Sequence, residues 1–122
     1  MTKIALVGHC GVDGPRIEAQ IRSIIDAADV CSCNDANALN RVCGEGVDLL
    51  LFNRELGFGF DDEQGVDLMA EVRESHPDVK MMLISDYPDA QAAAREVGAL
   101  PGFGKADLGT SKVEKALRDA LS

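Results

Sequence analysis

Six residues that could perform or prevent chemistry each follow an apolar run of this sequence. They are Gly8, His9 and Cys10 after the first run, Asn53 after the third, Ser85 at the end of the fourth and Lys105 after the fifth. Asn53 is the most informative, because an amide is a far poorer nucleophile than a carboxylate and carries no charge to hold a metal ion. Gly8 and His9 also lack the hard anionic oxygen that Mg²⁺ prefers. The set therefore indicates a polar site without a nucleophilic carboxylate.

The elements before these residues must bring them together. Strands are predicted at the short apolar runs, residues 3–8, 28–33, 47–52, 79–85 and 100–104. Amphipathic segments between them predict helices, the second capped by Asn34 or Asp35 and the fourth opened by Pro88. Such alternation is typical of α/β proteins with parallel strands and right-handed crossovers. We expect a flavodoxin-like (βα)5 three-layer sandwich with a parallel five-stranded sheet in the order 2-1-3-4-5 and functional residues in the loops after the strands.

Bulk properties restrict the function classes. The chain has 122 residues, of which 46% are hydrophobic, and this predicts one domain over residues 1–122. Its net charge of −9 argues against nonspecific nucleic-acid binding, where Lys and Arg must neutralise phosphates, and against an anionic membrane surface. No apolar run approaches a membrane span and no targeting segment precedes the first strand, so we expect a cytoplasmic protein. Its four cysteines are then expected to be reduced thiols.

The six residues, in this order, resemble the receiver domain of two-component response regulators, and the resemblance covers essentially the whole chain. The segments GVDLMAEVRESHPDVKMMLISDY, AREVGA and GFGK are similar to the third helix through fifth strand of a receiver. In that family an acidic pair after the first strand holds Mg²⁺, and an aspartate ending the third strand accepts a phosphoryl group. A Ser or Thr bonds that group, a Lys pairs with its charge, and an aromatic just before the Lys rotates between exposed and buried states. The resemblance implies phosphorelay signalling, with Ser85, Lys105 and Phe103 as retained switch-pocket residues.

The departures from the family pattern are equally informative. Gly8 and His9 stand at the acidic-pair positions, and Asn53 stands at the phosphoacceptor position. Ala106 replaces a usual proline after the lysine, and Phe103 lies one residue closer to the lysine than usual. The loop after Asn53 is about four residues longer than expected. Loss of both metal ligands and acceptor predicts a degenerate, phosphorylation-independent pseudo-receiver that is not an enzyme and needs no metal or other cofactor.

Such a domain is expected to act through protein–protein interaction. The resemblance implies docking through the fourth helix, fifth strand and fifth helix, the face that receivers commonly use for output. The partner would be a histidine kinase, another regulator, an output protein or a second copy in a homodimer. The chain ends at the fifth helix, so no output domain is expected within it.

Two details of the pocket are open to other interpretations. Lys105 is expected to hydrogen-bond Asn53 Oδ1 and nearby carbonyls and so hold the pocket in one state without phosphate. Asp61 and Asp62, in the long loop, are expected to be solvated, with the alternative that they supply replacement carboxylates for Mg²⁺.

An alternative function is a metal, thiol-redox or small-ligand sensor on the same fold, using His9, Cys10, Cys31 and Cys33. Cys31 and Cys33 are two apart on a predicted strand and share one face. Their spacing matches no structural zinc signature, and buried small hydrophobes are the competing interpretation. An enzyme on this scaffold is a third class, but no Ser-His-Asp or Cys-His-Asp set can be assigned.

Overall fold

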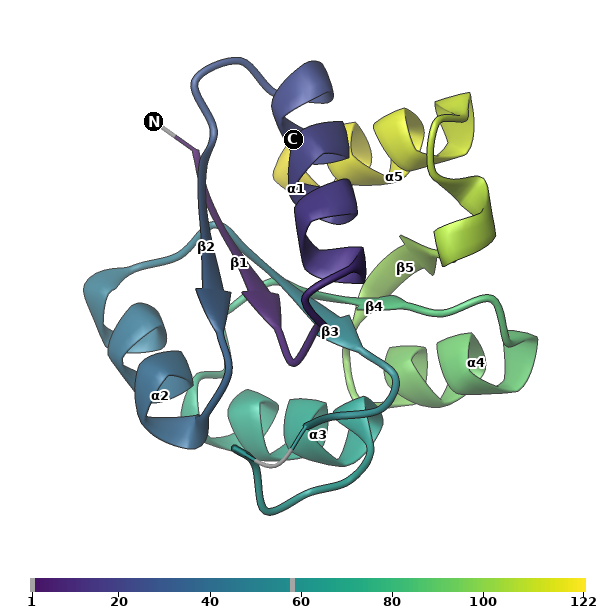
Figure 1. Ribbon diagram of the computed structural model, residues 1–122. Helices are drawn as coiled ribbons and strands as arrows, with labels where there is room; N and C mark the ends of the chain where they lie inside the picture. Colours follow the sequence, from purple (N-terminus) through teal and green to yellow (C-terminus); the bar gives the residue numbers. More distant parts are fainter. Residues whose placement is uncertain (1, 58) are drawn as a thin grey trace.

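Five parallel strands form one sheet in the order β2-β1-β3-β4-β5 (Figure 1). They are β1 (Lys3–Val7), β2 (Asp29–Cys33), β3 (Leu49–Asn53), β4 (Met81–Ile84) and β5 (Leu100–Phe103). The computed structural model describes residues 2–57 and 59–122, so Met1 and Phe58, the latter in the predicted long loop, lie outside it. The observed order confirms the predicted flavodoxin-like topology.

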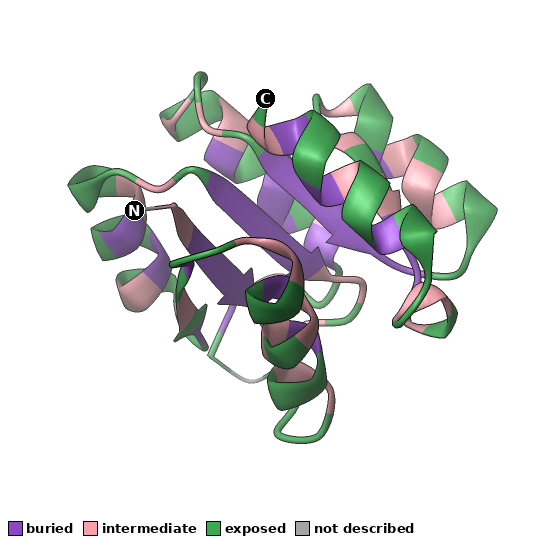
Figure 2. Cartoon of the chain, turned by 90° about the horizontal axis from the view of Figure 1, so that it is seen from above, coloured by how far each residue is buried: buried purple, intermediate pink, exposed green. Residues whose placement is uncertain are grey.

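Helices cover both faces of the sheet. Helices α1 (Asp13–Ile24) and α5 (Ser111–Leu121) lie on one face, and α2 (Ala36–Glu45), α3 (Gly65–Ser75) and α4 (Pro88–Glu96) lie on the other (Figure 1). A short 3-10 helix, η1 (Lys105–Asp107), precedes α5. Figure 2 shows the buried sheet between the two helical layers. Central strands buried on both faces explain why β3 and β4 are continuous apolar runs.

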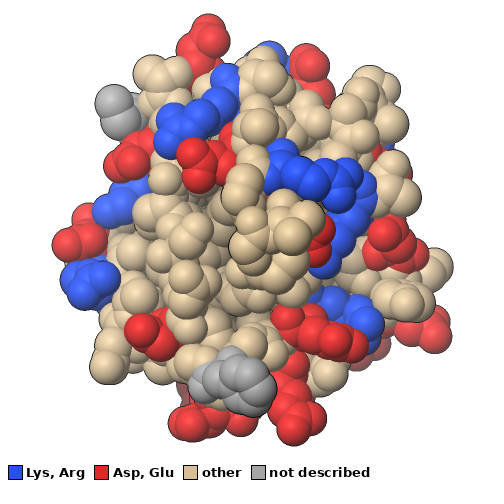
Figure 3. Space-filling model, in the orientation of Figure 1, with Lys and Arg blue, Asp and Glu red and all other residues tan. Residues whose placement is uncertain are grey.

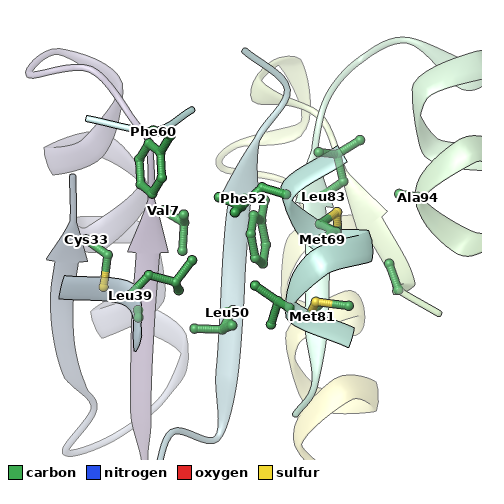
Figure 4. Close-up of a cluster of buried hydrophobic side chains, with 14 of the residues drawn as sticks. Val7, Cys33, Leu39, Leu50, Phe52, Phe60, Met69, Met81, Leu83 and Ala94 are labelled. Atoms are coloured by element: carbon green, nitrogen blue, oxygen red, sulfur yellow. The ribbon is translucent and has the colours of Figure 1, made fainter. Parts of the chain in front are cut away.

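Side-chain alternation along the strands divides the core into two clusters. Leu49 and Leu51 of β3 face α1 and α5, whereas Leu50 and Phe52 face the α2–α4 side. Figure 4 shows the second cluster, to which α3 contributes Met69. Burial of one such side chain contributes roughly 1.5–3 kcal/mol. The two clusters therefore fix the strand ends that carry the polar residues.

The loop between β3 and α3 folds back toward the sheet. Glu55 and Gln64 form an antiparallel bridge, and the Leu56 N–H donates to the Glu63 carbonyl at 2.9 Å. Phe60 is only 8% exposed and packs into the core on the α2–α4 side. The extra residues of this loop thus cover the carboxyl ends of the first strands.

A β-bulge interrupts the pairing of β4 with β5. Met82 pairs with Leu100 and Ile84 pairs with Phe103, so three steps on β5 match two on β4. Leu100 and Phe103 consequently both contact the cluster beneath α1 and α5, although they are three residues apart. A one-residue insertion in a strand moves the following side chain to the opposite face.

The helices and the surface charge have the following properties. Within the described residues, no helix has the length and apolarity that a membrane crossing requires. On the face shown in Figure 3, basic side chains lie in separate groups among acidic ones. The whole chain carries a net charge of −9, so these basic groups lie in a predominantly acidic molecule.

Candidate functional site

The carboxyl ends of the strands surround two adjoining hollows. The larger, of about 500 Å³, is lined by Gly8, His9, Cys10, Asn53 and Lys105 together with the long loop. The smaller, of about 150 Å³, is lined by Asn53, Ser85 and Lys105 among others. Five of the six predicted residues therefore share the larger hollow. Ser85 joins Asn53 and Lys105 in the smaller one.

Asn53 ends β3, and its amide bridges two loops. Its Nδ2 donates to the Gly8 carbonyl at 3.2 Å and to the Glu55 carbonyl at 2.8 Å. Both amide hydrogens are therefore used, since a primary amide has two. An ionised carboxylate could only accept hydrogen bonds and would face two carbonyl oxygens here. Asn53 thus stabilises this loop arrangement in a way that an aspartate could not.

Lys105 has an internal counterion that the sequence did not suggest. Its Nζ donates to Asp13 Oδ2 at 2.6 Å, and the two side chains are 33% and 21% exposed. This hydrogen bond holds the pKa of Asp13 below its usual value. The prediction that Lys105 bonds Asn53 Oδ1 is wrong. The lysine instead donates to Asp13, and the Asn53 amide donates to two carbonyl oxygens. Asp13 supplies a carboxylate to this site from the first turn of α1.

A double-mutant cycle with Asp13→Asn and Lys105→Met is expected to give a coupling of about 1 kcal/mol, because both charges are partly shielded from water. Urea denaturation of the four proteins measures it. The Lys115–Asp119 pair is the matched control, since its nitrogen–oxygen distance is 2.7 Å but its side chains are 78% and 66% exposed. Equal or larger coupling in that exposed pair would contradict a structural role for the Asp13–Lys105 bond.

Gly8 and His9 form the start of the first loop, and neither has a side-chain oxygen that could bind a metal ion. Gly8 has φ of +75°, and a Cβ there would lie 2.6 Å from Leu56 Cδ2. The His9 Nε2 lies 2.9 Å from the Leu51 carbonyl, so it carries the proton and donates. Burial lowers the pKa of His9 to about 4, and its buried Nδ1 has no partner among the described residues. His9 is therefore neutral at pH 7.

Ser85 and its neighbours shape the other side of the smaller hollow. Ser85 is 7% exposed, and its Oγ accepts from the Tyr87 N–H at 3.1 Å. Tyr87 itself is 60% exposed, with the Arg54 guanidinium 4.6 Å from its ring centroid. The hydroxyl of Ser85 thus holds the backbone in place just before α4.

Phe103 is not among the residues lining either hollow. It is 1% exposed and packs in the core beneath α1 and α5, a consequence of the bulge. Gly102 precedes it, and a Cβ there would lie 2.1 Å from the Leu83 carbonyl oxygen. The resemblance implies an aromatic side chain that rotates between exposed and buried states. Phe103 does not match that role, because it is buried on the face of β5 that packs against α1 and α5.

The candidate residues do not form a metal site, although Cys31 lies close enough to Cys33 to contribute to its raised pKa. Among residues 2–57 and 59–122, no group of three or more His, Cys, Asp or Glu side chains is arranged to hold a metal ion. Cys33 is buried, and burial raises its pKa to about 12, which disfavours the thiolate that metals and oxidants require. Asp61 and Asp62 line another hollow along the long loop. Asp62 raises the pKa of the nearby Glu71, because it can accept a hydrogen bond from the protonated form of Glu71.

Comparison with known proteins identifies the architecture. No protein-family model matches the sequence, and no curated protein matches it. The structure is similar to the signal receiver domain of a DNA binding response regulator protein from Colwellia psychrerythraea, with a TM-score of 0.76 and 11% identity over 98% of this chain and 97% of that one. It is similar to the signal receiver domain of an HD domain-containing protein from Pseudomonas fluorescens, with a TM-score of 0.77 and 23% identity over 98% and 86%. It also resembles the beryllofluoride-activated NtrC4 receiver domain dimer, with a TM-score of 0.80 and 14% identity over 99% and 97%.

These similarities extend over nearly the whole of each chain, and they agree with the observed strand order. At such identities they establish architecture and not activity. The chain has the fold of the response-regulator receiver domains of two-component signalling.

Proposed function

We propose that this chain is a phosphorylation-independent receiver-like domain that works in two-component signalling by binding another protein. The observation that carries the proposal is the amide of Asn53 at the phosphoacceptor position, with both hydrogens donated to carbonyl oxygens. An amide in this arrangement offers no anionic oxygen to attack phosphorus. The domain would therefore serve as an adaptor and not as an enzyme, in the cytoplasm where such signalling operates.

The rest of the pocket supports the same proposal. In phosphoryl transfer, metal ions and positioned charges supply most of the catalysis. Gly8 and His9 provide no carboxylate for Mg²⁺, and Lys105 is already paired with Asp13. The carboxylate of Asp13 thus neutralises the lysine charge that would otherwise pair with a phosphoryl group.

Acetyl phosphate with Mg²⁺ is expected to leave the intact mass of the protein unchanged, and beryllofluoride is expected to leave its amide spectrum unchanged. The variant Asn53→Asp should behave alike, because the metal ligands are still missing. A receiver with an intact acidic pair and acceptor provides the positive control. A stoichiometric phosphoryl adduct on the wild-type chain would overturn the proposal, and an adduct on Asn53→Asp alone would show that other carboxylates hold Mg²⁺.

We further propose that the partner docks on α4, β5 and α5. Ala92 is exposed on α4, and Ala90 and Ala93 are half-exposed, so a partner helix could approach the α4 backbone closely. The partner would be a histidine kinase, another regulator, an output protein or a second copy of the chain. The structural similarity to a receiver domain described as a dimer supports the last of these.

A further inference from the structure

Strand β5 cannot complete a regular ladder with β4. Pro101 lies within the bulge between the Met82–Leu100 and Ile84–Phe103 pairs, and proline has no N–H to donate. At this irregular end of the ladder, a side chain from a helix donates further hydrogen bonds to carbonyl oxygens of both strands.

The donor is the side-chain amide of Gln91, in the first half of α4. Its Nε2 lies 2.9 Å from the Leu83 carbonyl, 3.0 Å from the Ser85 carbonyl and 3.4 Å from the Phe103 carbonyl. One amide group therefore ties α4 to β4, to the loop after β4 and to β5. The two nearer carbonyls match its two hydrogens, and the third adds a longer contact.

Gly102 leaves the room that this side chain occupies. A Cβ on Gly102 would lie 3.0 Å from Gln91 Oε1 as well as 2.1 Å from the Leu83 carbonyl oxygen. The absence of a side chain at Gly102 thus leaves room for the Gln91 amide at the end of the ladder.

Apolar contacts hold α4 only weakly. Its one fully buried residue is Ala94, and Ala90 and Ala93 are half-buried. Alanine buries little apolar surface, and the gain scales with the area removed from water. Helix α3 offers a contrast, because it buries Leu68, Met69 and Val72. The hydrogen bonds of Gln91 therefore contribute an unusually large share of the attachment of α4.

We propose that Gln91 is a latch that holds α4 and the loop before it in a single position against the bulged β5. The latch fixes the surface that α4 presents. It does not depend on whether residue 53 accepts a phosphoryl group, so it stands or falls independently of the proposed function.

Relaxation-dispersion NMR of the wild-type chain tests the latch directly. We expect no microsecond-to-millisecond exchange shared by residues 85–96. In Gln91→Leu, we expect such exchange to appear and amide protection in α4 to fall about tenfold relative to α1, as local opening becomes easier. Gln64→Leu is the matched control, because Gln64 lines the groove between α3 and α4 but its side chain makes no capping hydrogen bond.

The variant Gln91→Glu separates a hydrogen-bonding role from space filling. Its carboxylate would face carbonyl oxygens at pH 7, and protonation near pH 5 would restore one donor. Protection of α4 relative to α1 should therefore rise as the pH falls, in Gln91→Glu and not in Gln91→Leu. Concerted exchange of residues 85–96 in the wild-type chain, or wild-type protection in Gln91→Leu, would overturn the proposal. The wild-type measurement decides the matter even if a variant fails to fold.

Discussion

Lowering the pH from 7 to 4 is expected to reduce the free energy of unfolding by up to about 3 kcal/mol through His9 alone. Burial lowers the pKa of His9 from its ordinary 6.5 to about 4, and its hydrogen bond to Leu51 opposes this only in part. Below pH 6.5 the unfolded chain binds a proton at His9 that the folded chain does not. The stabilisation is thus complete above pH 6.5 and is lost as the pH falls toward 4.

The variant His9→Gln isolates this effect. A glutamine Nε2 can still donate to the Leu51 carbonyl but does not titrate, so the profile between pH 4 and 6.5 should flatten. His76→Gln, which changes the second histidine, should keep the wild-type slope. Asp13 and Asp107, whose pKa values are also lowered, lose stabilisation below about pH 5, but this loss is common to the wild type and His9→Gln. Urea denaturation at several pH values measures the profiles, and parallel wild-type and His9→Gln curves would contradict the assignment.

Gly65→Ala is expected to lower the free energy of unfolding by about 3 kcal/mol, the upper end of typical overpacking costs. A Cβ at Gly65 would lie 2.0 Å from the carbonyl oxygen of Asn53, a backbone atom that cannot rotate away. Relief would require α3 to move from the end of β3. The Gly65 N–H also donates to the Arg54 carbonyl at 2.8 Å, which holds the helix start in place.

Gly44→Ala is the matched control for this substitution. Gly44 also lies in a helix, but nothing lies within 4 Å of a Cβ built there. Replacing it should raise stability by about 0.5–1 kcal/mol through helix propensity. Chemical denaturation followed by circular dichroism compares the two variants, and the Asn53 side-chain resonances should shift in Gly65→Ala alone. A Gly65→Ala protein as stable as the wild type would show that α3 is not pressed against β3.

The fold was predictable because its causes are local and periodic. The alternation of apolar runs with amphipathic segments determines the layers. For the cap of α2, the sequence left two candidates, Asn34 and Asp35. The structure identifies Asp35, whose side chain accepts from the Ala38 N–H at 2.7 Å. Strand boundaries differed by one or two residues, since hydrogen bonding and not polarity decides where pairing stops.

The sequence predicted which residues meet in the site, but not how they bond to one another. Gly8, His9, Asn53 and Lys105 meet because parallel strands end at one edge, which topology dictates. Their bonding was not predictable, because Lys105 and Asp13 are 92 residues apart and only the packing of α1 beside η1 joins them. The available indication was that Asp13 carries the only negative charge between the first strand and Pro15.

The environment of Phe103 was missed for a different reason. Phe103 lies one residue closer to Lys105 than the aromatic usually does, and a shift of one residue moves a strand side chain to the opposite face. Pro101 was a further indication of an irregular strand, because a proline inside a strand demands a bulge or an edge position. Gln91 followed from neither periodicity nor motif, and its role became visible only through the carbonyls that it contacts.

The bulged β5 also affects how copies of this chain can associate. As the last strand of the sheet, β5 presents an open edge, and such edges can template intermolecular strand addition and aggregation. Pro101 removes one donor from that edge, and the bulge breaks the regular repeat that an incoming strand would need. The irregularity thus protects the protein against sheet extension at this side. Any self-association on this side must use helical surfaces and side chains.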